Sequence, residues 1–141
     1  MENTKNLLLV DDDPDSLDLM SQALSDAGYA VVCCATSKEA VRCALEKPFD
    51  LVITDLMMES LDSGFSLSRW IKEYTRPREV PVVVVTAIGR QCGYDFNPRS
   101  PEELRAMFAD AYLEKPVPAQ VLLEQVQSLL HRQEVLENNH E

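Results

Sequence analysis

Acidic side chains occupy the two places in this sequence that are best suited to chemistry. Asp11, Asp12 and Asp13 are consecutive and follow an apolar segment, and Asp55 follows another. Neighbouring carboxylates raise one another's pKa unless a cation neutralises them. Mg2+ suits such a group because it takes oxygen ligands, keeps several waters and needs only one or two protein carboxylates. We therefore expect a Mg2+ site.

Within that site, Asp12 and Asp55 are the expected direct ligands of Mg2+. Asp11 would act mainly through a bound water, and the main-chain carbonyl of Met57 could complete the ligand set. Mn2+ can substitute for Mg2+ at a site of this kind.

The same residues predict phosphoryl chemistry, with the carboxylate of Asp55 attacking phosphorus. Such a transfer needs positioning and charge neutralisation more than covalent help from the protein. Besides Mg2+, the hydroxyl of Thr86 and the ammonium of Lys115 could neutralise the developing charge. Thr86 ends one apolar segment, and Lys115 follows another.

Alternating apolar and amphipathic segments must bring these residues together. The pattern predicts five strand–helix units in a three-layer α/β sandwich, with right-handed crossovers. In open sheets of this type, ligands bind beyond the carboxyl ends of the strands, where the residues above lie. The expected strands are 7–10, 30–34, 51–54, 80–85 and 111–114, and the expected helices begin near residues 14, 37, 65, 101 and 118.

Helix caps support this division of the chain. Asp13 precedes Pro14, which favours Asp13 as a helix cap over Asp13 as a metal ligand. Thr36 and Glu39 form a possible capping box for the second helix, whose inward residues include Leu45. The last helix is expected to run to about residue 132.

Four segments together resemble the receiver domain of two-component response regulators. They are Leu7-Leu-Leu-Val-Asp-Asp-Asp-Pro14, Asp50-Leu-Val-Ile-Thr-Asp55, Val82-Val-Val-Val-Thr-Ala87 and Tyr112-Leu-Glu-Lys-Pro116. The resemblance covers residues 5–130 and implies a flavodoxin-like (βα)5 fold with parallel sheet order 2-1-3-4-5. It makes residues 1–132 a receiver domain and residues 133–141 a polar C-terminal tail.

The resemblance implies a role for each residue of these segments. Asp55 resembles the phosphoacceptor, Asp11 and Asp12 the acidic pair, and Met57 the residue whose carbonyl binds the metal. The remaining counterparts are the switch hydroxyl Thr86 with its neighbour Ala87, the switch aromatic Tyr112, the phosphate-pairing Lys115, and Pro116, a candidate for a cis peptide bond.

Two loops depart from the pattern of the family. The loop 56–64 carries Glu59 where the family usually has proline and is one residue longer before glycine, and the loop 88–99 is unusually long beside the signalling face. In the family, the positions of Met57 and Ile88 govern access of the hydrolytic water. Two apolar side chains there predict a slowly lost acyl phosphate.

Composition limits the partners of the chain. Its 141 residues suit a single domain, and its net charge of −11 disfavours nucleic acid and anionic membranes as partners. The cysteines Cys33, Cys34, Cys43 and Cys92 form no C-x-x-C pair and suit small buried groups in a reducing cytoplasm.

We therefore expect a stand-alone, cytoplasmic receiver that signals by protein contact, because the sequence ends soon after Lys115. Its partners would be a sensor histidine kinase or histidine phosphotransfer protein and a downstream target protein. The sequence leaves open whether phosphorylation drives formation of a homodimer. Beyond accepting a phosphoryl group and slowly losing it, the domain would not be an enzyme.

Three other functions stay open from the residues. A small Mg2+-dependent phosphatase of the haloacid dehalogenase type would use the Asp11–Asp13 pair, although no second acidic pair follows segment 80–85. A flavodoxin-like module lacks the hydroxyl- and glycine-rich loop that a flavin needs. A receiver that serves only as a scaffold is disfavoured because the acceptor residues are present.

Overall fold

In the computed structural model, the described residues are 4–55, 63–75, 79–86, 102 and 108–138, without the side chains of residues 63–66, 86 and 136–138. Strands and helices alternate along them. The elements are β1 (Asn6–Val10), α1 (Pro14–Asp26), β2 (Ala30–Cys34), α2 (Ser37–Glu46), β3 (Leu51–Asp55), α3 (Ser63–Tyr74), β4 (Val82–Thr86), β5 (Ala111–Glu114) and α6 (Ala119–Asn138).

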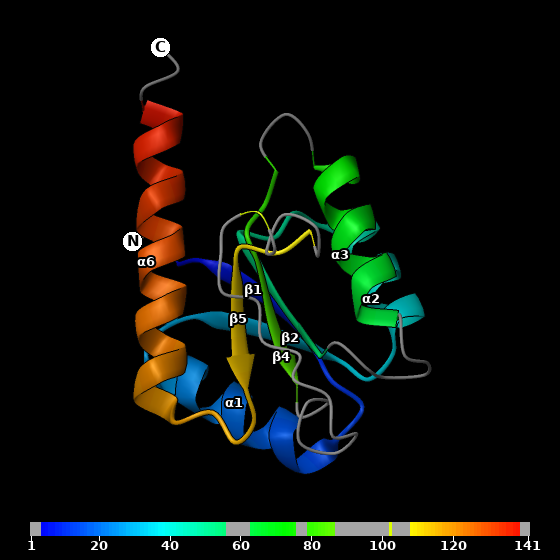
Figure 1. Cartoon of the computed structure of the whole chain (residues 1–141), viewed down its shortest axis with the longest axis vertical. Helices are drawn as coiled ribbons and strands as arrows, with labels where there is room; N and C mark the ends of the chain where they lie inside the picture. Colours follow the sequence, from blue (N-terminus) through cyan, green and yellow to red (C-terminus); the bar gives the residue numbers. More distant parts are fainter. Residues whose placement is uncertain (1–3, 56–62, 76–78, 87–101, 103–107, 139–141) are drawn as a thin grey trace.

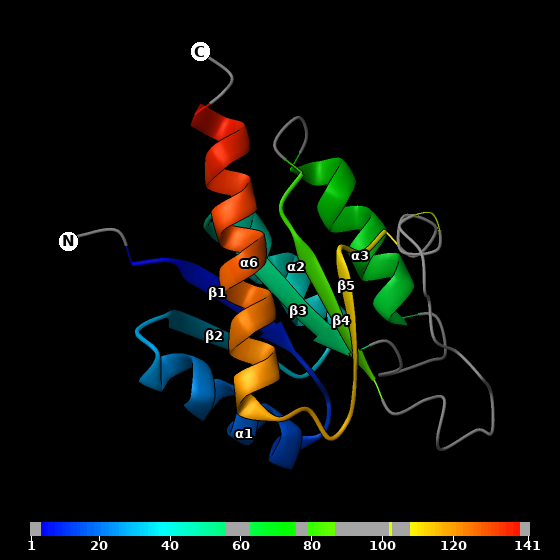
Figure 2. The same cartoon turned by 60° about the vertical axis from the view of Figure 1, so that its left-hand side comes forward.

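The five strands form one parallel sheet in the order β2-β1-β3-β4-β5, which confirms the predicted flavodoxin-like fold. Helices α1 and α6 cover one face of the sheet, and α2 and α3 cover the other (Figures 1 and 2). Because all strands run in the same direction, their carboxyl ends share one edge. None of the described helices combines the length and the apolarity needed to cross a bilayer.

Strand β1 explains why the central strands are apolar throughout. Leu8 and Val10 pack in the layer of α2 and α3, whereas Leu7 and Leu9 pack in the layer of α1 and α6. Successive strand residues point to opposite faces, and both faces here are covered by helices. All four side chains are fully buried, and each such burial contributes roughly 1.5–3 kcal/mol.

The helix caps predicted at Asp13 and Thr36 are present. Asp13 Oδ1 accepts a hydrogen bond from the Asp15 amide at 3.2 Å, with Pro14 in the first helical turn. Thr36 Oγ1 accepts one from the Glu39 amide at 3.1 Å. The Glu39 carboxylate reaches back to the Ala35 amide at 2.9 Å, one residue before the cap, which is a variation on the expected capping box.

Three details of the prediction are wrong. Helix α3 begins at Ser63, inside the segment expected to be a loop. Leu45, expected to face inward, is 57% exposed in the last turn of α2. Helix α6 continues past residue 132 to Asn138, because Gln133 is buried and Glu134 Oε2 pairs with Lys5 Nζ at 3.2 Å. The helix expected from residue 101 lies largely outside the described residues.

A charged anchor holds the amino ends of β4 and β5 together. Asp110 Oδ2 accepts a hydrogen bond from the Val82 amide at 2.8 Å and pairs with Lys72 of α3. Asp110 Oδ1 pairs with Arg132 Nη2 of α6 at 2.9 Å. This carboxylate therefore links the helices of both outer layers to the sheet.

Candidate functional site

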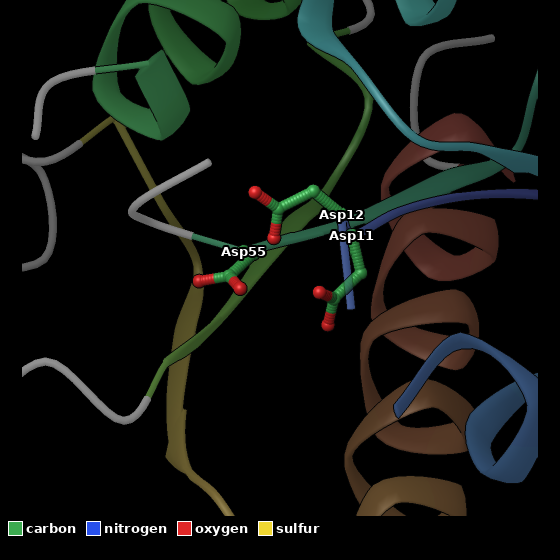
Figure 3. Close-up of side chains that lie close together, drawn as sticks. All are labelled: Asp11, Asp12 and Asp55. Atoms are coloured by element: carbon green, nitrogen blue, oxygen red, sulfur yellow. The ribbon is translucent and has the colours of Figure 1, made fainter. Parts of the chain in front are cut away.

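Three carboxylates meet at the carboxyl edge of the sheet. Asp11 and Asp12 follow β1, Asp55 ends β3, and these two strands are neighbours. One oxygen from each of the three side chains lies within 4.8 Å of the others (Figure 3). The parallel sheet thus brings together acidic residues that are far apart in the sequence.

These three side chains differ in exposure. Asp11 is fully buried, Asp55 is 7% exposed, and Asp12 is exposed to solvent. Asp11 Oδ1 accepts a hydrogen bond from the Asp13 amide at 2.9 Å, whereas the buried Asp11 Oδ2 has no aligned hydrogen-bond donor among the described atoms. A buried carboxylate oxygen that lacks an aligned donor is costly unless a cation lies beside it.

The described cation beside this cluster is the ammonium of Lys115, which follows β5. Its Nζ lies 2.8 Å from Asp11 Oδ2 and 3.0 Å from Asp55 Oδ2. Burial lowers the pKa of Lys115, but the contacts with Asp11 and the charge of Asp55 outweigh this effect and raise it. The side chain therefore stays charged at neutral pH and links β5 to β1 and β3.

This donor set fits a small, hard divalent cation. Its side-chain donors are carboxylate oxygens, and the exposed Asp12 leaves room for the waters that Mg2+ keeps. Among the described side chains, the three carboxylates outnumber the ammonium of Lys115, which contacts Asp11 and Asp55. Asp11, Asp12 and Asp55 are the residues that would hold Mg2+.

The other described residues of the predicted site lie on β4 and β5. Thr86 ends β4 and aligns with Glu114, although its side chain is outside the described set. Tyr112 is half-buried on the α2–α3 side of β5. Burial, and then the charge of Glu114, raise the pKa of Tyr112, so its hydroxyl stays protonated at neutral pH. The Lys115–Pro116 peptide bond is cis, the form that the resemblance implies.

Four parts of the predicted site lie outside the described residues. They are Met57, Ala87, Ile88 and the loop 88–99. The roles predicted for them rest on the sequence alone.

One residue next to the site, Cys34, has no sequence motif that marks it. The carbonyl of Cys34, at the end of β2, accepts a hydrogen bond from the Asp11 amide at 3.0 Å. Any residue type can supply a main-chain carbonyl, so the sequence held no sign of this contact. The predicted strand order alone could have suggested it.

Comparison with known proteins decides the family. The profile of the response regulator receiver domain matches residues 7–127. The chain belongs to the response regulator receiver family. Among solved structures, this receiver is similar to a response regulator receiver domain protein (CheY-like) from Methanospirillum hungatei, with 29% identity and a TM-score of 0.76 over 94% of this chain and 98% of that one.

Two curated relatives differ in how much of their length the receiver matches. It is 32% identical to the transcriptional regulatory protein GltR of Pseudomonas aeruginosa, over 92% of this chain and 50% of GltR. It is 26% identical to the polar-differentiation response regulator DivK of Brucella ovis, over 90% of this chain and 97% of DivK. The receiver thus spans about half the length of GltR and nearly all of DivK.

Proposed function

We propose that this receiver accepts a phosphoryl group on Asp55 and holds Mg2+ with Asp11, Asp12 and Asp55. The observation that carries the proposal is the convergence of three carboxylates within 4.8 Å, next to the ammonium of Lys115. The cluster lies at the carboxyl edge of the sheet, where ligands bind in open sheets of this type. The family membership supports the same chemistry.

In the proposed reaction, an oxygen of Asp55 attacks the phosphorus of a phosphohistidine. A phosphorus–oxygen bond forms, the phosphorus–nitrogen bond breaks, and the imidazole of the donor leaves with the electron pair. When bound, Mg2+ supplies charge neutralisation for the phosphoryl oxygens. Asp11 and Asp12, together with Asp55, would hold the ion, and the nearly buried Asp55 presents its carboxylate at the end of β3.

In this scheme, Lys115 has different partners before and after phosphoryl transfer. In the resting protein its ammonium contacts Asp11 and Asp55, which offsets the cost of burying their charges. After transfer, the same ammonium pairs with the new phosphoryl oxygens. The Thr86 hydroxyl and the Ala87 region contact the phosphoryl group, and Tyr112 moves with Thr86 to change the surface around β5.

The proposed donor is a sensor histidine kinase or a histidine phosphotransfer protein, and the proposed output is contact with a downstream target protein. We propose a stand-alone receiver because the match to DivK extends over 97% of that protein. The net charge of −11 argues against direct contact with nucleic acid or anionic membranes. The free thiols Cys33, Cys34 and Cys43 are consistent with a reducing cytoplasm.

A phosphatase of the haloacid dehalogenase type is disfavoured by the match to the receiver family. A scaffold receiver that takes no phosphoryl group is the remaining alternative. Incubation with Mg2+ and acetyl phosphate, followed by intact mass, separates the two. Our proposal predicts the gain of one phosphoryl group, which chelation of Mg2+ or the change Asp55→Asn abolishes.

The matched control is Asp18→Asn, which removes the same charge from an exposed position on α1. This variant should gain the phosphoryl group at the wild-type rate. An unmodified wild-type protein under conditions that phosphorylate another receiver would support the scaffold instead. Steady release of phosphate from small esters, unaffected by Asp55→Asn, would support the phosphatase.

A further inference from the structure

Two thiols from different elements lie in direct contact beside the acidic cluster. Cys34 Sγ, at the end of β2, is 3.5 Å from Cys43 Sγ of α2. We propose that Cys34 and Cys43 are a reversible thiol–disulfide site, which a peroxide closes and a small thiol reopens. The inference does not depend on phosphorylation of Asp55, because bridge formation is measured by itself.

The surroundings of the two sulfurs give each a separate part in the reaction. Cys34 is 3% exposed in the α2–α3 layer, whereas Cys43 is half-buried and lies closer to solvent. An oxidant therefore reaches Cys43 first, and Cys34 is the neighbour that resolves the oxidised sulfur. Cys33 is exposed and, as the preceding strand residue, points to the opposite face of the sheet.

The geometry requires a small movement. A disulfide bond is about 2.0 Å long, so the sulfurs must approach by roughly 1.5 Å, through side-chain rotation and local backbone adjustment. Among the described strands, β2 is at the edge of the sheet and has β1 as its one partner. Its last residue can shift without breaking contacts to a second strand.

The proposed reaction is balanced with hydrogen peroxide as the oxidant. Cys43 Sγ attacks one peroxide oxygen, the oxygen–oxygen bond breaks, and a sulfenic acid and one water form. Cys34 Sγ then attacks Cys43 Sγ, a sulfur–sulfur bond forms, and the sulfur–oxygen bond breaks. The second water leaves with the thiol proton, so two thiols lose two electrons and the peroxide gains them.

A hydrogen bond connects this pair to the candidate metal site. The carbonyl of Cys34 accepts from the Asp11 amide at 3.0 Å, and Asp11 supplies a buried carboxylate to the cluster. Closing the bridge pulls the end of β2 toward α2 and away from this contact. We therefore expect oxidation to displace Asp11 and to slow phosphoryl acceptance.

The test uses the full chain with Cys33→Ser and Cys92→Ser, so that Cys34 and Cys43 are its two thiols. After treatment with dilute hydrogen peroxide, the intact mass should fall by two hydrogens and both thiols should resist alkylation. Trypsin should then release peptides 6–38 and 43–69 joined by one bridge, and dithiothreitol should separate them.

Cys43→Ser in the same background is the matched variant. It removes one partly exposed sulfur, should stay folded by circular dichroism, and should give no bridged peptide. In the wild-type chain, oxidation of the exposed Cys33 verifies that the peroxide acted. If Cys33 is oxidised while Cys34 and Cys43 stay alkylatable, the proposal is wrong and the two sulfurs serve only as packing groups.

The link to the metal site is tested with acetyl phosphate and Mg2+ on the bridged and the reduced chain. We expect the bridged chain to gain its phosphoryl group roughly tenfold more slowly, since small displacements of catalytic groups are costly. Equal rates would overturn the link to Asp11. If neither form is phosphorylated, the proposed function fails while the bridge itself remains measurable.

Discussion

The two edges of the sheet use charge in opposite ways. At the amino edge, Asp110 is shared by Lys72, Arg132 and the Val82 amide, so two cations surround one carboxylate. At the carboxyl edge, three described carboxylates lie close together, and the ammonium of Lys115 contacts two of them, Asp11 and Asp55. The first arrangement pairs one carboxylate with two cations, whereas the second, among the described residues, places three carboxylates beside one cation.

This difference distinguishes a structural carboxylate from a cluster that we propose to be functional. A satisfied buried carboxylate fixes elements in place and has little to offer a ligand. Repulsion among clustered carboxylates opposes folding. Binding of a cation relieves that repulsion and stabilises the folded protein. We therefore expect the same residue types to stabilise the protein at one edge and to make it responsive to a cation at the other.

Removing the amino-edge carboxylate should have the largest effect. Asp110→Ala leaves the ammonium of Lys72 partly buried without its partner and the Val82 amide without its acceptor, so we expect a loss of about 3 kcal/mol in unfolding free energy. Urea unfolding followed by Trp70 fluorescence measures it. Asp110→Asn keeps a hydrogen-bond acceptor for the Val82 amide, so its unfolding free energy should fall by less than that of Asp110→Ala. An equal fall in the two variants would mean that the hydrogen bond to Val82 contributes nothing to the effect.

Removing the carboxyl-edge cation should cost less and respond to metal. Lys115→Met should lose about 2 kcal/mol in unfolding free energy in a metal chelator, because Asp11 and Asp55 then lose the ammonium that both contact. Millimolar Mg2+ should recover most of that loss, whereas it should not rescue Asp110→Ala. An equal Mg2+ response in both variants would remove the distinction between the two edges.

The sequence predicts that two apolar residues, Met57 and Ile88, slow the loss of a phosphoryl group from Asp55. Met57→Asn or Ile88→Glu should speed its loss by roughly fivefold, because a polar side chain admits and orients water. Decay of the phosphorylated protein after removal of donor, followed by intact mass, gives the rate. An unchanged rate in both variants would mean that these positions do not control water access here.

The exposed member of the acidic cluster should give the smallest change, with the opposite sign. Asp12→Ala relieves repulsion with Asp11 and Asp55 and should raise the unfolding free energy by about 0.5 kcal/mol while weakening Mg2+ binding. Thermal unfolding and Mg2+ titration measure the two effects. Asp18→Ala, an exposed acid elsewhere on the chain, is the control and should change neither by a similar amount.

The sequence predicts the frame of this receiver well because its signals are local or periodic. Apolar runs mark the five strands, and Asp13 and Thr36 mark helix starts through hydrogen bonds within one turn. The convergence of Asp12, Asp55 and Lys115 follows from the parallel sheet, since each residue lies at or next to the end of a strand.

The sequence does not predict contacts that depend on packing between distant segments. Asp110 pairs with Lys72, which lies on α3, and with Arg132, which lies on α6. The Cys34–Cys43 contact depends on the placement of α2 over the end of β2. Burial of Gln133 extends α6 beyond the point where the apolar pattern fades. None of these has a motif of its own.

The most direct test of the account is to locate the phosphoryl group chemically. The protein is incubated with acetyl phosphate and Mg2+, then reduced with borohydride, which converts an aspartyl phosphate into homoserine. We predict homoserine at position 55, in tryptic peptide 43–69, when Mg2+ is present, and none after chelation. Homoserine in peptide 6–38, or the same yield without Mg2+, would contradict Asp55 as the metal-dependent acceptor.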